Sequence, residues 1–352
     1  MNASKSSQYA SEKPKIVLIA TGGTVLGHAP SSREMTNYTS AVYGIDDLVK
    51  ASPGVHDIAE IITVTFLSKD SINLEDRDVI KLCQLTHTEL AKSDVDAVGV
   101  VGGTDALSAV ACALDATSDS NKAIGVIGAV RPFSAISSDG PGNLLSLVEL
   151  LCDDEAKNRG AMVVSGELIL PARFTEKTDC NRINAFEAPN SKPLGRFVNA
   201  KPVFTSPAAR SLGHRYMDVS KIDLPQELPY VPVLFAHLGV SSKMFNDAID
   251  AGNEGVILAA MGSGYWPQEA LRTMNPGNVP VVVCCQSVSG YCTSDGVSFG
   301  IPAGFLSAAK SRILLVICLL LRLTSDDIED VFGRIRGGKA SRRRNGELLA
   351  KL

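Results

Sequence analysis

Short apolar runs recur along the first half of the chain, and they alternate with segments of helical periodicity. Parallel strands buried on both faces have this continuous apolar character. Strands that alternate with helices predict βαβ units around a parallel sheet. The predicted strands are 15–20, 62–67, 97–101, 123–127 and 161–164. Helices are expected over 144–151 and after Asn73, the predicted N-cap of a helix with Glu75 and Asp76 in its first turn.

A proline-rich stretch interrupts this alternation. Helical periodicity fades between prolines 202 and 232 and then returns, with strands predicted at 231–238, 255–260 and 279–285 and helices at 242–251, 267–273 and 307–323. We therefore predict an α/β protein with a larger N-terminal domain, a mainly parallel sheet flanked by helices, and a smaller C-terminal α/β domain. The predicted divisions are a disordered leader (1–14), the N-terminal domain (15–201), a linker (202–230), the C-terminal domain (231–336) and a basic tail (337–352).

The composition excludes several classes of protein. Lys+Arg number 34 against 38 Asp+Glu, a net charge of -4, which argues against a nucleic-acid binder. The eight cysteines form no C-x-x-C pair and mostly lie in apolar runs, typical of small buried side chains, and the histidines are scattered. We expect no metal or cofactor. The longest apolar run, 313–321, is far shorter than the ~20 residues of a membrane span, so a cytoplasmic protein without a membrane partner is predicted.

Two predicted strands end in similar glycine-rich turns. The first opens into Thr21-Gly22-Gly23-Thr24, and the third opens into Gly102-Gly103-Thr104-Asp105. Neither the dinucleotide fingerprint nor the P-loop pattern is present. Ligands of open α/β sheets bind at the carboxyl ends of the strands. The repeated pattern therefore indicates a site with two threonine hydroxyls beside close-packed backbone.

The order of these motifs resembles that of the bacterial-type L-asparaginase family, including its glutaminase-asparaginase members. The resemblance extends from about residue 15 to 332. Residues 19–24 resemble the first family signature, and 103–105 resemble the core of the second. The other matching segments are the active-site loop at 37–39, the segments 128–132 and 138–144, and the lysine-bearing segment 175–178.

The resemblance implies a role for each matching residue. Thr24 would be the nucleophile, with Tyr38 adjusting its proton, because a threonine hydroxyl needs a neighbouring base. Thr104, Asp105 and Lys177 would form a second triad that activates water or the hydroxyl. The implied substrate-binding residues are Gly23, Ser68, Lys69, Thr104, Asp105, Ala129 and Ser263, with Asp105 facing the α-ammonium and Ser68 facing the carboxylate of the substrate.

The family also implies an assembly. Its members form dimers or dimers of dimers, so a homodimer or homotetramer is expected, with Ser263 reaching across the subunit boundary. The segment 287–299 is shorter than its usual counterpart. Asp295 is the candidate there for the acidic residue that a neighbouring subunit often contributes.

Two further departures concern the substrate's amino-acid end and the second turn. Lys69 replaces a usually neutral residue, often Gln, and Gly102 stands where His is more common. If Lys69 pointed into the site, its cation would partly neutralise Asp105 and weaken binding of free L-asparagine. The alternative is that Lys69 extends into solvent.

Each singled-out residue also has a structural alternative. Thr21 could only hydrogen-bond a turn, Tyr38 could be a surface aromatic, and Lys177 could be a solvated loop charge. A structural pairing of Arg131 with Asp139 is preferred to a catalytic role for either residue.

Three functions remain open at this point. The leading one is an amidohydrolase that converts L-asparagine to L-aspartate and ammonia through a Thr-bound acyl intermediate. The alternatives are an amidase whose substrate lacks a free α-amine, and a catalytically weak homologue that acts as a binding or assembly protein. The joint presence of Thr24, Thr104, Asp105 and Lys177 favours the enzyme.

Overall fold

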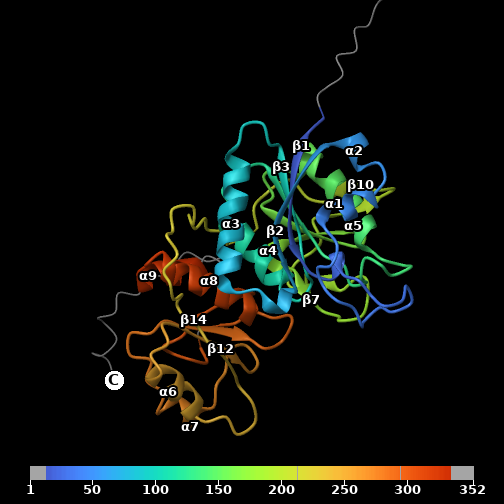
Figure 1. Cartoon of the computed structure of the whole chain (residues 1–352). Helices are drawn as coiled ribbons and strands as arrows, with labels where there is room; N and C mark the ends of the chain where they lie inside the picture. Colours follow the sequence, from blue (N-terminus) through green and yellow to red (C-terminus); the bar gives the residue numbers. More distant parts are fainter. Residues whose placement is uncertain (1–12, 212, 294, 334–352) are drawn as a thin grey trace, which may run out of the picture.

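The computed structural model describes residues 13–333, apart from 212 and 294, and contains the two predicted α/β domains (Figure 1). The predicted leader lies mostly outside these residues, and the predicted basic tail lies wholly outside them. The N-terminal domain is built on an eight-stranded sheet of order β10-β9-β6-β5-β4-β3-β1-β2. Its parallel part comprises β1 (Lys15–Gly22), β2 (Glu60–Lys69), β3 (Ala97–Val101), β4 (Ala123–Ile127) and β5 (Ala161–Ser165).

Helices cover both faces of this sheet because successive side chains of a strand point to opposite faces. Ile16, Leu18 and Ala20 of β1 pack toward α1 (Ile45–Lys50), α2 (Val55–Ile58) and α5 (Gly140–Leu151). Val17 and Ile19 pack toward α3 (Asp76–Ala91), α4 (Leu107–Ala116) and α8 (Ala308–Leu320). The continuous apolar runs of β1, β3, β4 and β5 are thus explained by burial on two faces.

The start of helix α3 corrects one prediction. Asn73 does not cap it, because Asn73 belongs to a separate 3-10 helix, η2 (Ser71–Asn73). Asp70 is the N-cap residue of η2, and its side chain accepts from the Ile72 N–H. Helix α3 instead has Glu75 as its N-cap residue, and the Asp78 carboxylate accepts from the Glu75 N–H at 3.1 Å.

The far side of the sheet is antiparallel, which the sequence analysis did not predict. Strands β6 (Leu168–Pro171), β9 (Gly195–Val198) and β10 (Lys201–Phe204) extend the sheet beyond β5. Strand β10 crosses the predicted domain boundary at residue 201, so the predicted linker begins inside a strand. An edge position tolerates Pro202 because one side of an edge strand needs no ladder hydrogen bonds.

The C-terminal domain holds a second parallel sheet, of order β11-β12-β13-β14. Its strands are β11 (Val233–Phe235), β12 (Val256–Ala260), β13 (Val281–Cys285) and β14 (Ile301–Pro302), and its further helices are α6 (Lys243–Asp250), α7 (Gln268–Leu271) and α9 (Ser325–Gly333). Strand β11 is shorter than the predicted 231–238. Helix α8 packs against both β12 and α4, so it lies between the two domains (Figure 1). This position explains why its sequence is apolar on nearly every side.

The cysteines fit their predicted packing role. Five of the eight are buried: Cys83, Cys112, Cys284, Cys292 and Cys318. Burial raises the pKa of the Cys83 thiol to about 12 and that of Cys112 to about 11, which keeps both as thiols at neutral pH. Across the described residues, no helix combines the length and apolar character that a membrane crossing requires.

Candidate active site

The two glycine-rich turns meet at one edge of the N-terminal sheet. Strands β1 and β3 are parallel neighbours, so their carboxyl ends lie side by side. Gly23, with φ of +85°, lies so close to the second turn that a Cβ on it would be 2.3 Å from the Cα of Gly103. The left-handed φ and the missing side chain are both needed for this approach. The structure therefore brings Thr24 and Thr104 to the same edge.

Thr24 is paired with the loop tyrosine. It begins the 3-10 helix η1 (Thr24–Leu26), is 6% exposed, and its Oγ1 lies 2.6 Å from the hydroxyl oxygen of Tyr38. The loop is held by mutual backbone hydrogen bonds between His28 and Thr39, both of 2.8 Å. Tyr38 is half-buried and is therefore not a free surface aromatic. Gly27 makes room for it, because a Cβ there would be 3.1 Å from the tyrosine ring.

Thr104 is the centre of a second polar cluster. The Lys177 ammonium donates to the Thr104 hydroxyl at 2.9 Å and to Asp105 Oδ1 at 2.6 Å. Thr104 is 6% exposed, whereas the Asp105 side chain is 54% exposed. Lys177 lies on the two-residue strand β7 (Glu176–Lys177), which pairs with β8 (Phe186–Glu187). Lys177 is thus bonded inside the cluster and is not a solvated loop charge.

Ser71 supports the second turn, and the sequence analysis missed it. Its hydroxyl accepts from the Asp105 N–H at 3.2 Å, and the residue is 5% exposed. A Cβ on Gly103 would be 2.5 Å from the Ser71 hydroxyl, so the serine fits only against glycine. The available signal was the polar run Ser68-Lys69-Asp70-Ser71 directly after a predicted strand.

Thr21 and Gly102 form a structural contact below the site. The Thr21 hydroxyl donates to the Val101 carbonyl at 3.4 Å, and a Cβ at position 102 would be 2.5 Å from the same hydroxyl. Thr21 therefore joins β1 to the end of β3. Gly102 leaves room for this hydroxyl, which gives a physical reason for the absence of a larger residue at this position.

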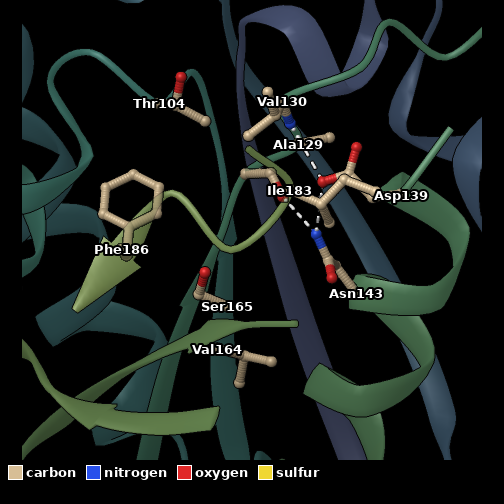
Figure 2. A pocket seen from close by; sticks show the side chains of 10 residues that line it. Thr104, Ala129, Val130, Asp139, Asn143, Val164, Ser165, Ile183 and Phe186 are labelled. Carbon is tan, nitrogen blue, oxygen red and sulfur yellow. Dashed lines mark hydrogen bonds between the residues drawn. The ribbon is translucent and has the colours of Figure 1, made fainter. Parts of the chain in front are cut away.

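Asp139 and Asn143 fix the backbone around Ala129. Asn143 donates to the Gly128 carbonyl at 2.9 Å, and the Asp139 carboxylate accepts from the backbone N–H groups of Val130 and Arg131 at 3.1 and 2.9 Å. Asp139 thus has a structural role, as preferred, but it bonds the backbone of Arg131. The guanidinium of Arg131 donates to a backbone carbonyl instead. Figure 2 shows Asp139, Asn143 and Ala129 lining a small pocket. Thr104, Ser165 and Phe186 line its other sides.

The backbone of Gly23 is already fully engaged. Its N–H donates to the Lys69 carbonyl at 2.9 Å, and its carbonyl accepts from Leu26 and Ala41 at 3.1 and 3.2 Å. The N–H of Gly23 is consequently not free to donate to a substrate. Its contribution to the site is the close approach of the two turns.

Lys69 does not neutralise Asp105 as predicted. Its ammonium donates to Asp78 at 2.8 Å, with side-chain exposures of 38% for Lys69 and 14% for Asp78, while Asp105 is paired with Lys177. The hydrogen bond that Lys69 donates to Asp78 raises the pKa of Lys69. The lysine is held by the first turn of α3, so neither the expected position beside Asp105 nor a free extension into solvent describes it.

The remaining expected residues are exposed. Ser68 lies on edge strand β2 next to Lys69. Ser263 lies on the loop that follows β12, where its carbonyl accepts from the Thr293 N–H at 2.8 Å, and Asp295 is also exposed. Within the described part of the chain, the side chains of Ser263 and Asp295 make no hydrogen bond to the Thr24 or Thr104 cluster. Among residues 13–333, apart from 212 and 294, no group of three or more His, Cys, Asp or Glu side chains is placed to hold a metal ion.

Comparisons with known proteins agree with this architecture. The family model "Asparaginase, N-terminal" matches residues 15–210, and "Glutaminase/Asparaginase C-terminal domain" matches residues 230–332. A protein named probable L-asparaginase 4 from Schizosaccharomyces pombe is 34% identical over 333 residues, covering 94% of this chain and 92% of that protein. L-asparaginase 2 from Escherichia coli is 29% identical over 330 residues, covering 91% and 93%.

A solved structure extends the agreement to three dimensions. The crystal structure of a probable cytoplasmic L-asparaginase from Campylobacter jejuni matches with a TM-score of 0.82 at 31% identity, covering 92% of this chain and 100% of that chain. The fold and the two family models define the protein as a two-domain α/β enzyme of the asparaginase type. With both family models matched in order, the chain belongs to the asparaginase family.

Proposed function

We propose that this protein hydrolyses the side-chain amide of L-asparagine to L-aspartate and ammonia through an acyl intermediate on Thr24. One observation carries the proposal: two threonine hydroxyls stand at neighbouring strand ends, and each is bonded to a side chain able to move a proton. A threonine hydroxyl attacks only with help from such a partner. The named L-asparaginases among the relatives support the choice of substrate.

In the first half-reaction, Thr24 Oγ1 attacks the side-chain amide carbon. The threonine proton leaves along the 2.6 Å hydrogen bond to Tyr38. As the carbon–nitrogen bond breaks, the leaving nitrogen takes up one proton and departs as ammonia, which leaves an aspartyl ester on Thr24. The Tyr38 hydroxyl thus relays a proton and is restored at the end of the step.

In the second half-reaction, water attacks the ester carbon. Because Lys177 donates to Thr104 Oγ1, the hydroxyl proton of Thr104 is free to point toward the substrate. We propose that Thr104 and Lys177 relay the proton that water loses. Thr24 regains its proton when the ester bond breaks, so L-aspartate and the original hydroxyl are formed.

Asp105 supports a substrate with a free α-amine. Its Oδ1 accepts from Lys177, its side chain is half exposed, and the carboxylate retains capacity to accept from an ammonium group. Because Lys69 is bonded to Asp78, the reason for expecting a substrate without an α-amine falls away. The intact pairs at Thr24 and Thr104 likewise favour a working enzyme over a binding or assembly protein.

We further propose that the protein works in the cytoplasm as a homodimer or homotetramer. Exposure of Ser263, on a loop of the C-terminal domain, is compatible with its reaching a neighbouring subunit. The cytoplasmic L-asparaginase with the matching fold supports the compartment. Light scattering coupled to size exclusion tests the assembly, and a monomer that retains full activity would contradict it.

The proposed function is tested by ammonia release and by trapping the acyl group. Wild-type protein is assayed with L-asparagine, L-glutamine and N-acetyl-L-asparagine in parallel. We expect ammonia chiefly from L-asparagine, and acid-quenched turnover mixtures should carry an aspartyl ester on the peptide that contains Thr24. Ammonia released from none of the three would reject the amidohydrolase, and an ester on Thr104 would reject Thr24 as the nucleophile.

A further inference from the structure

A buried lysine of the C-terminal domain bonds to the segment that leads into the active-site lysine. Lys310, on helix α8, is 1% exposed. Its ammonium donates to the Arg173 carbonyl at 3.1 Å, to the Thr175 carbonyl, and to Glu176 Oε1 at 2.8 Å. An ammonium group is costly to bury unless acceptors surround it. All three acceptors lie within the four residues that precede Lys177.

The strand β7 divides its two side chains between the domains. Successive side chains of a strand point to opposite sides. Glu176 accordingly faces Lys310 of α8, while Lys177 faces Thr104 and Asp105. Because the two residues are adjacent in β7, the contact of Glu176 with α8 constrains the backbone that carries Lys177.

Helix α8 also touches the other half of the Thr104 cluster. It packs against α4, which begins at Leu107, two residues after Asp105. One helix of the C-terminal domain thus contacts both the segment that carries Lys177 and the helix that follows Thr104. The Lys177–Thr104 hydrogen bond therefore joins two segments that both contact α8.

We propose that Lys310 is a positioning residue that holds β7 so that the Lys177 ammonium stays on Thr104. This inference rests on the proposed function, in which Lys177 takes part in the chemistry. Its consequence is that the C-terminal domain sets the geometry of a cluster whose residues all belong to the N-terminal domain. Misplacement of a reacting group by about 1 Å can cost ~100-fold in rate.

The same helix supplies a matched control. Arg312 lies two residues further along α8 and also bonds the N-terminal domain, but its guanidinium is bidentate to Asp76 of α3, at 2.6 and 2.8 Å. Asp76 lies on α3, outside the segment that carries Lys177. Lys310→Met and Arg312→Met each remove one charged contact between the domains, and only the first acts on β7.

The experiment compares kinetics and hydrogen exchange in these two variants. Lys310→Met is expected to lower kcat for L-asparagine by about tenfold or more with KM within about threefold, because positioning for chemistry is lost while binding is kept. Amide exchange over residues 173–178 should become faster. Arg312→Met should lose thermal stability yet keep kcat within about twofold and leave exchange over 173–178 unchanged.

Each other outcome has a defined meaning. Equal kcat losses in the two variants, or normal kcat and exchange in Lys310→Met, would overturn the positioning role. Wild-type protein that releases no ammonia would reject the proposed function. Amide hydrogen exchange over residues 173–178 in Lys310→Met would then still decide whether Lys310 holds this segment. If Lys310→Met does not fold, Glu176→Gln decides: it keeps an acceptor but removes the charge, and it should lower kcat by about two- to tenfold and speed exchange over 173–178. Unchanged values in Glu176→Gln would then overturn the proposal.

Discussion

The Thr24 and Thr104 clusters use the same kind of hydroxyl, but the chain builds them in different ways. Thr24 meets Tyr38 only 14 residues away, across one loop held by backbone hydrogen bonds. Thr104 meets Lys177 across 73 residues, through a strand that is itself bonded to the other domain. The first cluster depends on a loop, and the second depends on sheet and domain packing.

This difference predicts different ways to fail. A loop with few buried contacts can open without unfolding the domain, so the Thr24 pair can be lost locally. The Thr104 pair instead joins the turn before α4, a helix that packs on α8, to β7, which is bonded to α8, so we expect its geometry to follow the packing of these elements. Substitutions in the Thr24 cluster therefore test a pair that depends on a loop, and substitutions in the Thr104 cluster test a pair that depends on domain packing.

The largest effect is expected from Thr24→Ala. It deletes the proposed nucleophile from a turn that backbone hydrogen bonds hold, so kcat should fall by about a thousandfold or more while folding is kept. Steady-state kinetics with circular dichroism checks both. A variant that keeps a tenth of the wild-type kcat would show that Thr24 is not the nucleophile.

Lys177→Met is expected to have the next largest effect. It removes the group bonded to both Thr104 and Asp105, so kcat should fall by ~100-fold or more with little change in thermal midpoint. Lys192→Met serves as the control, because Lys192 is an exposed lysine of the same domain. Normal hydrolysis by Lys177→Met would remove Lys177 from the mechanism.

Tyr38→Phe tests the loop side of the comparison. It keeps the ring that packs against Gly27 and deletes the hydroxyl at 2.6 Å from Thr24, so a kcat loss of about ten- to a hundredfold is expected. Tyr43→Phe is the matched control, because the Tyr43 hydroxyl is hydrogen-bonded to His28 at 2.8 Å and not to Thr24. Equal kinetics in the two variants would assign Tyr38 a structural role only.

Lys69→Gln is expected to change little. The ammonium is bonded to Asp78, so KM for L-asparagine should stay within about twofold of wild type. The pKa of Lys69 is raised in the folded state, so the ion pair stabilises the protein at neutral pH and is lost only as pH rises through that raised value, above 10.5. A marked fall in KM at neutral pH would show instead that Lys69 acts on Asp105.

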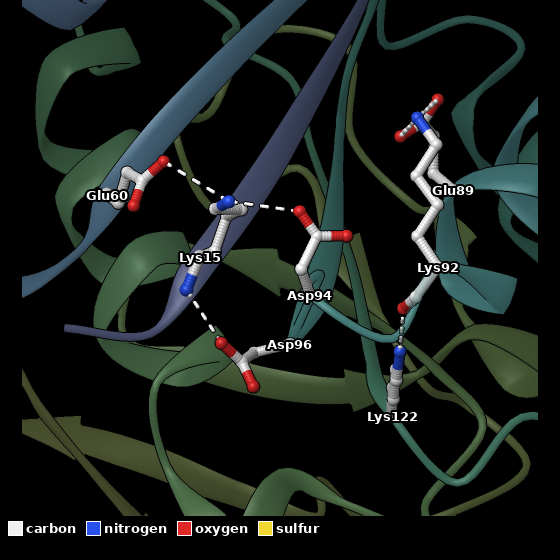
Figure 3. Close-up of polar contacts among 7 residues, drawn as sticks. All are labelled: Lys15, Glu60, Glu89, Lys92, Asp94, Asp96 and Lys122. Atoms are coloured by element: carbon white, nitrogen blue, oxygen red, sulfur yellow. Dashed lines mark hydrogen bonds and ion pairs between the residues drawn. The ribbon is translucent and has the colours of Figure 1, made fainter. Parts of the chain in front are cut away.

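The smallest effect is expected at the amino-terminal ends of the same strands, opposite the candidate site. Figure 3 shows Lys15 at the start of β1, bonded to Asp94 at 3.0 Å, to Glu60 at 3.5 Å and, through its backbone N–H, to Asp96 at 2.7 Å. These exposed contacts join strand beginnings and include no threonine pair. Lys15→Met should leave kcat within about twofold of wild type. A large kcat loss would mean that the two edges of the sheet are coupled.

The sequence by itself determined the parallel core and predicted where the candidate site lies. Runs such as 97–101 and 123–127 coincide with β3 and β4, because burial on both faces leaves a continuous apolar pattern. Topology then requires the turns after the parallel neighbours β1 and β3 to share one edge, and this places Thr24 and Thr104 near each other.

Only the tertiary structure decided which partners the charged and polar side chains would take. Nothing local in the sequence marks Asp78 as the partner of Lys69, Ser71 as the support of Asp105, or Lys310 as the contact of Glu176. The antiparallel strands β6, β9 and β10 were missed for the same reason, since strand pairing is settled by distant segments. Periodicity records whether a residue is buried, whereas the partner of a buried charge is fixed only when separate elements pack together.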